Sequence, residues 1–292
     1  MSSVAANGIT IEYEIHGHGE PLLLVHGLGA QLSDWHPDFI AEFVDRGFQV
    51  ITFDNRDMGL STEFDWKPPS PVRAVLGALF RRPARAGYLL TDMADDASGL
   101  LDALGIASAH VVGVSMGGMI SQTLAIRHPE KVRSLTSIMS NTGDKRHGAI
   151  APSLMVKMAR RRKPTLANAV EQAITTVRWI SGPAFNEAVT RPLIEHSVAR
   201  SFRPAGIARQ TAAILASPNR TEALGKVTVP TLVIHGSVDP LVLPSGGVAT
   251  AKAIPGSRLL VFPDMGHDIP RNRWAEVLDA IRQNAQRSMA ER

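Results

Sequence analysis

Five short runs along the chain are apolar at nearly every position and are bounded by turn residues. They are residues 22–25, 50–53, 110–114, 135–138 and 232–234. Such runs are typical of strands that helices cover on both faces of a parallel sheet. An earlier stretch, residues 9–15, alternates apolar with polar positions, which predicts a strand with one solvated face. We expect this strand at the edge of the sheet.

Apolar residues at helical spacing lie between these runs. This spacing occurs at residues 35–44 and 93–104. Gly47 follows the first segment and Gly105 follows the second, and each glycine is expected to end its helix. Strands and helices therefore alternate, which predicts an α/β fold with a mostly parallel sheet and helices on both faces. A ligand site in such a sheet lies at the carboxyl ends of the strands.

Two segments interrupt the alternation. Residues 65–90 hold four prolines around an apolar and basic stretch at 72–85. Residues 141–220 are helix-forming, and the strand pattern resumes after them at Pro230. We expect a core of residues 1–140 and 221–292, with residues 141–220 inserted as a helical cap, or lid, domain.

The net charge of +4 is unevenly distributed. Residues 141–220 hold 13 Lys and Arg against 4 Asp and Glu, and the rest of the chain is net acidic. Because no recognition helix, zinc finger or aromatic RNA-binding motif accompanies the basic segment, nucleic acid is not an expected partner. The basic run at 160–163 has two interpretations, a solvated helix end or peripheral contact with an anionic membrane. The same two interpretations apply to residues 72–85.

The chain contains no cysteine, which excludes disulfides, a thiolate nucleophile and a cysteine zinc site. The N-terminus lacks the basic and apolar regions of a signal peptide, and no run approaches the roughly 18 apolar residues of a membrane span. We therefore expect a cytoplasmic protein. Neither a metal nor a cofactor is expected, and the sequence does not determine the oligomeric state.

A G-x-S-x-G pattern occupies residues 113–117, where a buried strand ends and a helix begins. A serine on this sharp turn, the nucleophile elbow, adopts strained dihedral angles that expose its Oγ. Side chains at Gly113 and Gly117 would obstruct the close contact between the strand and the helix. The pattern itself is common, but its position makes Ser115 a candidate nucleophile.

A serine nucleophile needs a base, and the base needs an orienting acid. Asp239 follows the apolar run that begins at 232, and His267 follows another at 259–262. The chain order Ser115, Asp239, His267 is the order that the elbow motif requires. A second interpretation takes the acid from after the 135–138 run, where Asp144 is the nearest candidate.

These motifs, with His-Gly-Leu-Gly at 26–29 and Asp-Asn-Arg-Asp-Met-Gly-Leu-Ser at 54–61, resemble the α/β-hydrolase fold superfamily. The 54–61 stretch and the Met-Gly-His ending are similar to anthracycline (aclacinomycin-type) methylesterases and actinobacterial carboxylesterases. The resemblance implies a sheet of about eight strands with an inserted cap. It also implies Ser115 as nucleophile, Asp239 as acid, His267 as base, and an oxyanion hole formed by the backbone N–H groups of Leu28 and Met116.

The function predicted from these residues is hydrolysis of carboxylic esters through an acyl-enzyme on Ser115. The expected substrate is a small-molecule ester with an apolar acyl or alcohol part. The fold and the catalytic triad do not separate this activity from that of a thioesterase, phospholipase, lactonase, carbon–carbon bond hydrolase or perhydrolase. A receptor-like ligand-binding protein that retains its triad is the non-enzymatic alternative.

Overall fold

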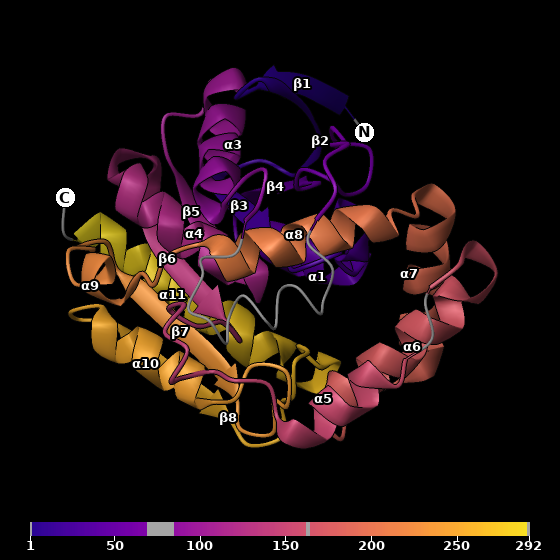
Figure 1. The fold of residues 1–292 in the computed structure, drawn as a ribbon. Helices are drawn as coiled ribbons and strands as arrows, with labels where there is room; N and C mark the ends of the chain where they lie inside the picture. The colour runs from indigo at the N-terminus through magenta and orange to yellow at the C-terminus, as the bar shows by residue number, and fades with distance from the viewer. Residues whose placement is uncertain (1, 69–84, 162–163, 291–292) are drawn as a thin grey trace.

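The computed structural model describes residues 2–68, 85–161 and 164–290. In this part of the chain the strands are β1 (Ser2–Ala6), β2 (Ile9–His16), β3 (Glu20–Val25), β4 (Phe48–Phe53), β5 (Ala109–Val114), β6 (Val132–Ile138), β7 (Thr231–Gly236) and β8 (Arg258–Phe262). They form one sheet in the order β1-β2-β4-β3-β5-β6-β7-β8 (Figure 1). The β1–β2 and β2–β4 pairs are antiparallel, and the other pairs are parallel. The predicted α/β fold is confirmed.

The prediction that residues 9–15 form an edge strand is wrong. β2 pairs with β4 on one side and with β1 on the other, where Val4 lies opposite Ile11. The β1 segment begins with exposed Ser2 and Ser3 and ends in small alanines. It carries no clear alternation of apolar and polar positions, so nothing in the sequence marks it as the edge strand.

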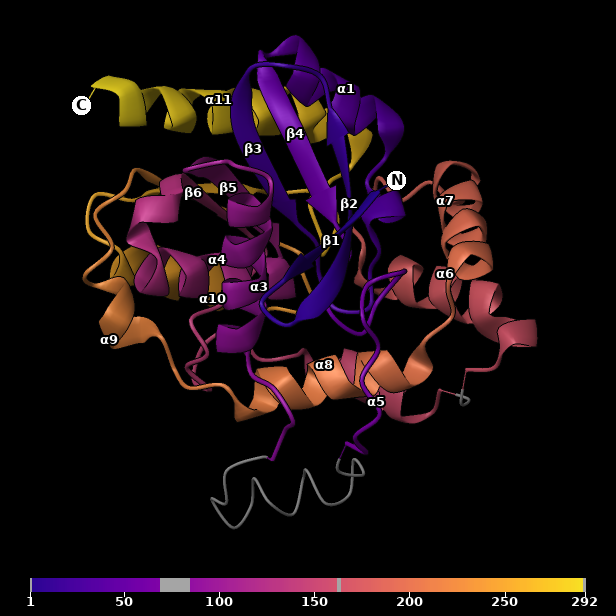
Figure 2. The ribbon, with the colours of Figure 1, turned by 90° about the horizontal axis from the view of Figure 1, so that it is seen from above.

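The sheet is covered by helices on both faces. Among the described residues, the helices outside 141–220 are α1 (Pro37–Asp45), α3 (Leu90–Ala103), α4 (Met116–Arg127), α9 (Thr221–Leu224), α10 (Ser245–Ala253) and α11 (Trp274–Ala290), with single 3-10 turns at Leu32–Asp34, Pro129–Lys131 and Arg271–Arg273. Figure 2 shows α1 and α11 together on one side of the sheet and α3 and α4 on the other. The excursion expected at 65–90 falls largely on residues 69–84, which lie outside the described residues.

Alternate residues of the inner strands supply two separate cores. Leu23 and Val25 of β3 pack into the core beneath α3 and α4, whereas Leu22 and Leu24 pack into the core beneath α1 and α11. All four side chains are completely buried. Burying a side chain of this size stabilises the fold by about 1.5–3 kcal/mol. The apolar runs of the sequence are therefore uninterrupted because alternate side chains are buried on opposite faces of the sheet.

The segment between β6 and β7, which we call the helical insertion (residues 141–220), contains α5 (Pro152–Ala159), α6 (Ala169–Ile180), α7 (Glu187–Arg200) and α8 (Pro204–Ala216), with a 3-10 turn at Leu166–Asn168. It contacts the loops that follow β3, β4 and β8: Gly29 lies against Ile207, Gly206 against Asp57, and Gly182 against Asp264. These loops lie at the carboxyl ends of their strands, where the sequence places the ligand site. Among the described residues, no helix combines the length and apolar character needed to cross a membrane.

Candidate active site

Ser115 lies on a strained turn between β5 and α4. Its φ of 58° and ψ of −120° fall in a backbone region that L-residues rarely adopt. A Cβ added at Gly113 would lie 2.2 Å from the Gly117 carbonyl oxygen, and one at Gly117 would lie 2.0 Å from the Val25 carbonyl oxygen. Both glycines are therefore needed for the close contact of strand and helix, as the sequence indicated.

The structure brings Ser115, His267 and Asp239 together in one hydrogen-bonded chain. His267 Nε2 lies 2.8 Å from Ser115 Oγ, and His267 Nδ1 lies 2.7 Å from Asp239 Oδ2. With the Nδ1 proton donated to the carboxylate, Nε2 of the neutral ring accepts the hydroxyl proton of Ser115. The side chain of His267 is 6% exposed and that of Asp239 is fully buried, so little water competes for these bonds.

Hydrogen bonds keep the Asp239 carboxylate ionised. Burial favours the neutral acid, but hydrogen bonds from His235 and His267, the charge of His267 and the backbone N–H of Val242 outweigh it and lower the pKa of Asp239 to about 2. Asp239 Oδ1 accepts from the N–H groups of Leu241 and Val242 at 2.8 and 2.9 Å. A fixed negative charge therefore faces His267 Nδ1.

The alternative acid, Asp144, pairs with Arg146 instead of His267. Its carboxylate accepts hydrogen bonds from the Arg146 guanidinium at 2.8–3.1 Å, and it lies 3.3 Å from His147 Nδ1. The hydrogen bonds from Arg146 lower the pKa of Asp144 well below its usual range. The structure thus places Asp239, and not Asp144, at His267.

Two backbone N–H groups near Ser115 have no acceptor in the part of the chain that the structure describes. Met116 is the first residue of α4, where an N–H has no partner within the helix. Leu28 follows Gly27, whose Cα lies close enough to Ser115 that a Cβ there would be 3.2 Å from the serine Cβ. Neither the Met116 nor the Leu28 N–H has an acceptor among the residues that the structure describes. These are the two donors that the sequence analysis expected.

His26 stabilises the loop that carries Leu28. Its Nδ1 accepts from the Gly27 N–H at 2.8 Å, and its carbonyl oxygen accepts from Asn55 Nδ2 at 3.1 Å. Burial lowers the pKa of His26 to about 4, so the ring is neutral and can accept at Nδ1 near neutral pH. The imidazole therefore shapes this loop through hydrogen bonding.

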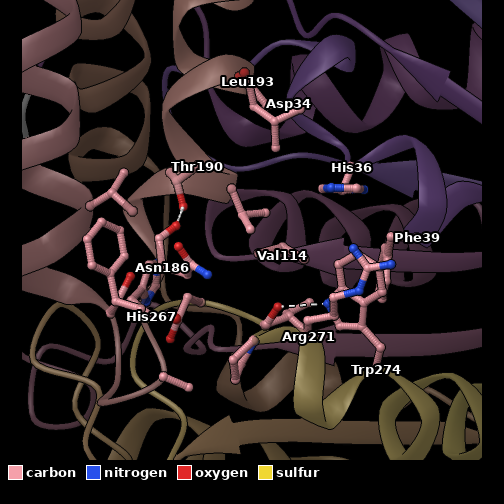
Figure 3. Close-up of a pocket in the computed structure, with 18 of the residues that line it drawn as sticks. Asp34, His36, Phe39, Val114, Asn186, Thr190, Leu193, His267, Arg271 and Trp274 are labelled. Carbon is pink, nitrogen blue, oxygen red and sulfur yellow. Dashed lines mark hydrogen bonds between the residues drawn. The ribbon is translucent and has the colours of Figure 1, made fainter.

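A cavity of about 500 Å³ opens beside His267, between the core and the helical insertion (Figure 3). Val114, which precedes Ser115, and His267, which lies within hydrogen-bond distance of it, line the cavity, whereas Ser115 itself is not among the lining residues. Phe39 and Trp274 supply aromatic walls from the core, and Leu193 closes the cavity from α7. The other lining residues are a mixture of apolar and polar side chains, and the polar ones include Asp34, His36 and Asn186. The cavity can hold an apolar group attached to a reacting centre at Ser115.

Buried ion pairs hold the helical insertion against the core. Arg209 of α8 lies 2.8 Å from Asp57, and Arg200 of α7 lies 2.8 Å from Asp54; these four side chains are at most 6% exposed. The basic excess of residues 141–220 is therefore matched in part by acidic residues in the loop after β4. The sequence analysis interpreted the basic run at 160–163 as solvated or membrane-facing and predicted no partner for Arg200 or Arg209.

Asp268 is a site residue that the sequence analysis missed. Its Oδ1 accepts from the N–H groups of Gly182 and Gly266 at 3.0 and 3.1 Å, which joins the insertion to the loop that carries His267. The backbone N–H of His267 also donates to Ile180 of α6 at 2.7 Å. The position of the imidazole thus depends on the insertion, and no motif in the sequence signals this contact.

The comparisons with known proteins agree with this geometry. A family model described as alpha/beta hydrolase fold matches residues 20–270. The chain belongs to the α/β-hydrolase fold family. This α/β hydrolase is 27% identical over 273 residues to rhodomycin D methylesterase of Streptomyces peucetius, with 86% of this chain and 85% of the relative covered. The predicted similarity to the methylesterase branch is confirmed.

Other relatives of this α/β hydrolase include a hydrolase of another kind and an esterase. It is 30% identical over 298 residues to 2-hydroxymuconate semialdehyde hydrolase of a Pseudomonas strain, CF600, with 96% of this chain and 89% of the relative covered. Among solved structures, a thermophilic esterase of Thermogutta terrifontis is 25% identical, with a TM-score of 0.71 and 99% of both chains covered. The relatives therefore support hydrolysis as the reaction, but they differ in the type of bond that they cleave.

Proposed function

We propose that this α/β hydrolase cleaves carboxylic esters through an acyl-enzyme on Ser115. The observation that carries the proposal is the hydrogen-bonded chain of Ser115, His267 and Asp239, together with the nearby N–H groups of Leu28 and Met116, which have no acceptor among the described residues. The similarity to a methylesterase and to an esterase structure favours ester substrates. In this role the helical insertion is a cap that encloses the substrate.

In the acylation step, Ser115 Oγ attacks the ester carbonyl carbon while His267 Nε2 takes the hydroxyl proton. The carbonyl π electrons move onto oxygen, and the resulting oxyanion accepts from the N–H groups of Leu28 and Met116. Asp239 stabilises the imidazolium that forms. When the tetrahedral intermediate collapses, the carbon–oxygen bond to the alcohol breaks, and His267 donates its proton to that leaving oxygen.

Deacylation repeats these steps with water. His267 Nε2 takes a proton from a water molecule, whose oxygen attacks the acyl carbon, and the same two N–H groups stabilise the second oxyanion. Collapse of this intermediate returns the proton to Ser115 Oγ and releases the carboxylic acid. The chemistry uses side chains and backbone groups of the protein and water.

The cavity supports a substrate with an apolar acyl or alcohol part. Its aromatic walls at Phe39 and Trp274 and its aliphatic side at Leu193 would bury such a group beside the reacting carbon. A volume of about 500 Å³ lies within the range of pockets for small molecules. We therefore propose small-molecule esters with one bulky apolar substituent.

Substitution of the serine tests the proposal. We expect Ser115→Ala to lower kcat for p-nitrophenyl butyrate by about 10⁴-fold or more, because the covalent route is lost. Ser153→Ala, at an exposed serine of α5, is the matched control and should retain wild-type turnover. Equal turnover in Ser115→Ala and wild type would exclude the assignment.

Carbon–carbon bond hydrolysis is a second candidate, favoured by the 30% identity to 2-hydroxymuconate semialdehyde hydrolase. The serine, histidine and two N–H donors would serve either reaction, as they would for a thioester or a lactone. Initial rates on p-nitrophenyl esters, an acyl-CoA, a lactone and a vinylogous 1,5-diketone distinguish these activities. Turnover of the diketone above all the esters would favour the second candidate.

Two expectations from the sequence remain proposals with their own tests. A receptor-like role would give a burst of alcohol release followed by negligible steady turnover.

Peripheral binding to anionic membranes is supported by α5, where Met155 and Val156 are 57% and 51% exposed beside Lys157. Equal flotation with neutral and anionic liposomes would exclude it. A cytoplasmic location remains a prediction from the sequence.

A further inference from the structure

Helix α8 of the insertion buries a glutamine against the loop that carries Leu28. Gln210 is completely buried, and its Oε1 accepts from the Gly29 N–H at 3.0 Å. Its Nε2 donates to the Arg56 carbonyl oxygen at 2.9 Å. The oxygen and the nitrogen of the Gln210 side-chain amide therefore both form hydrogen bonds with the core. The oxygen binds Gly29, the residue next to Leu28.

The hydrogen bonds of this loop single out the Leu28 N–H. The N–H groups of residues 27 and 29–32 all have acceptors: His26 Nδ1 for Gly27, Gln210 for Gly29, the Gly27 carbonyl oxygen for Ala30, Asp34 for Gln31 and Asp54 for Leu32. The Leu28 N–H has none among the described residues. The loop is thus held at every neighbouring N–H and leaves one donor available.

The peptide between Leu28 and Gly29 is contacted directly by α8. Gly29 has a φ of +76°, in the left-handed region where glycine moves at low energetic cost. The bond from the Gly29 N–H to Gln210 fixes this peptide plane, and with it the ψ angle of Leu28, which joins it to the preceding peptide that carries the Leu28 N–H. Helix α8 also confines Gly29 sterically, because a Cβ at Gly29 would lie 3.1 Å from Ile207.

We propose that Gln210 is a positioning residue for the oxyanion hole, holding the Leu28 N–H toward the developing oxyanion from the helical insertion. The inference rests on the proposed function. It gives α8 a role in stabilising the transition state, in addition to the role of the helical insertion in enclosing the substrate. It predicts a defect in kcat with little change in substrate binding, because the oxyanion exists in the transition state and not in the bound ester.

The test compares variants at Gln210 by steady-state kinetics with p-nitrophenyl butyrate. Gln210→Met, close in size but without the acceptor, should lower kcat about tenfold, less than the roughly 10²-fold that loss of an oxyanion donor costs. KM should stay within twofold, and the inhibition constant of phenylboronic acid, which forms a tetrahedral adduct, should rise in proportion to the loss in kcat. Gln210→Asn, one methylene shorter, no longer reaches the Gly29 N–H and should act in the same direction.

Two variants separate positioning from support of the fold. Gln210→Glu keeps an acceptor oxygen, and burial favours the neutral carboxyl, whose O–H can donate to the Arg56 carbonyl. It should restore kcat to within threefold of wild type. Arg203→Met removes another anchor of α8, the 2.6 Å hydrogen bond to the Ser61 carbonyl. It should lower Tm and leave kcat within twofold.

The inference is overturned if Gln210→Met and Gln210→Asn both keep kcat within twofold of wild type. It is also overturned if Arg203→Met loses as much kcat as Gln210→Met at the same fall in Tm. Failure of the proposed function gives a different result, namely a wild-type enzyme without ester turnover or a Ser115→Ala variant that retains it. An inactive Ser115→Ala variant with fully active Gln210 variants contradicts this inference alone.

Discussion

Asp54 and Arg200 form a buried ion pair that joins the core to the helical insertion. Asp54 Oδ2 lies 2.8 Å from Arg200 Nη1, with the two side chains 0% and 6% exposed. The same carboxylate accepts from the backbone N–H groups of Leu32 at 2.8 Å and Leu60 at 2.9 Å. One acidic side chain therefore fixes the end of α7 to the loops that follow β3 and β4.

Removal of Arg200 should destabilise the protein strongly. Arg200→Met leaves the Asp54 carboxylate buried without its cation, and we expect the free energy of unfolding to fall by about 3 kcal/mol. Arg127→Met is the control, because the Arg127 side chain is 42% exposed in its pair with Asp95 and should cost less than about 1 kcal/mol. Urea denaturation measures both, and equal losses would contradict the importance of the buried pair.

The contrast between this ion pair and the Ser115 site shows what the sequence could predict. Ser115, Asp239 and His267 each follow an apolar run, and parallel strands bring such positions to the same edge of the sheet. Asp54 and Arg200 lie far apart in the chain, one in the core and one in the helical insertion, and their contact depends on how α7 packs. The one available signal was the excess of basic residues at 141–220 against a net acidic remainder. Gln210 gave no signal, since a buried glutamine in a helix matches no motif.

Stability at acid pH should depend on Asp239. Hydrogen bonds in the folded state lower its pKa from 3.8 to about 2, so the carboxylate contributes stability above the unfolded pKa. This contribution is lost as the pH falls from about 4 to about 2, and the shift corresponds to about 2 kcal/mol. Asp239→Asn should lack this part of the pH dependence. Parallel curves of unfolding free energy against pH for the two proteins would contradict the assignment.

Gly117, the last glycine of the elbow motif, should not tolerate a methyl group. A Cβ at Gly117 would lie 2.0 Å from the Val25 carbonyl oxygen and 2.7 Å from that of His26. We expect Gly117→Ala to lower the free energy of unfolding by about 3 kcal/mol and to reduce ester turnover, because α4 and the His26 loop must separate. Gly225→Ala is the control, at a φ of −62°, and should change stability by less than about 1 kcal/mol. Similar stability of the two variants would contradict this account.

The size of the cavity should set substrate preference. Val189 of α7 lines the cavity, and Val189→Trp would fill part of it. We expect kcat/KM for bulky apolar esters to fall about tenfold, with the value for p-nitrophenyl acetate within twofold of wild type. Val156→Trp, on the exposed face of α5, should change neither value. A uniform loss across all esters in Val189→Trp would place the apolar group of the substrate elsewhere.

Covalent labelling by a p-nitrophenyl alkylphosphonate tests the central claim most directly, because its phosphonyl group forms a stable adduct with an activated serine. The account predicts release of one equivalent of p-nitrophenol per chain, loss of ester turnover in step with that release, and an adduct mapped by mass spectrometry to Ser115. His267→Ala should slow the labelling by about 10³-fold or more, and Ser115→Ala should remain unlabelled. An adduct on another residue, or ester turnover that survives full labelling of Ser115, would contradict the account.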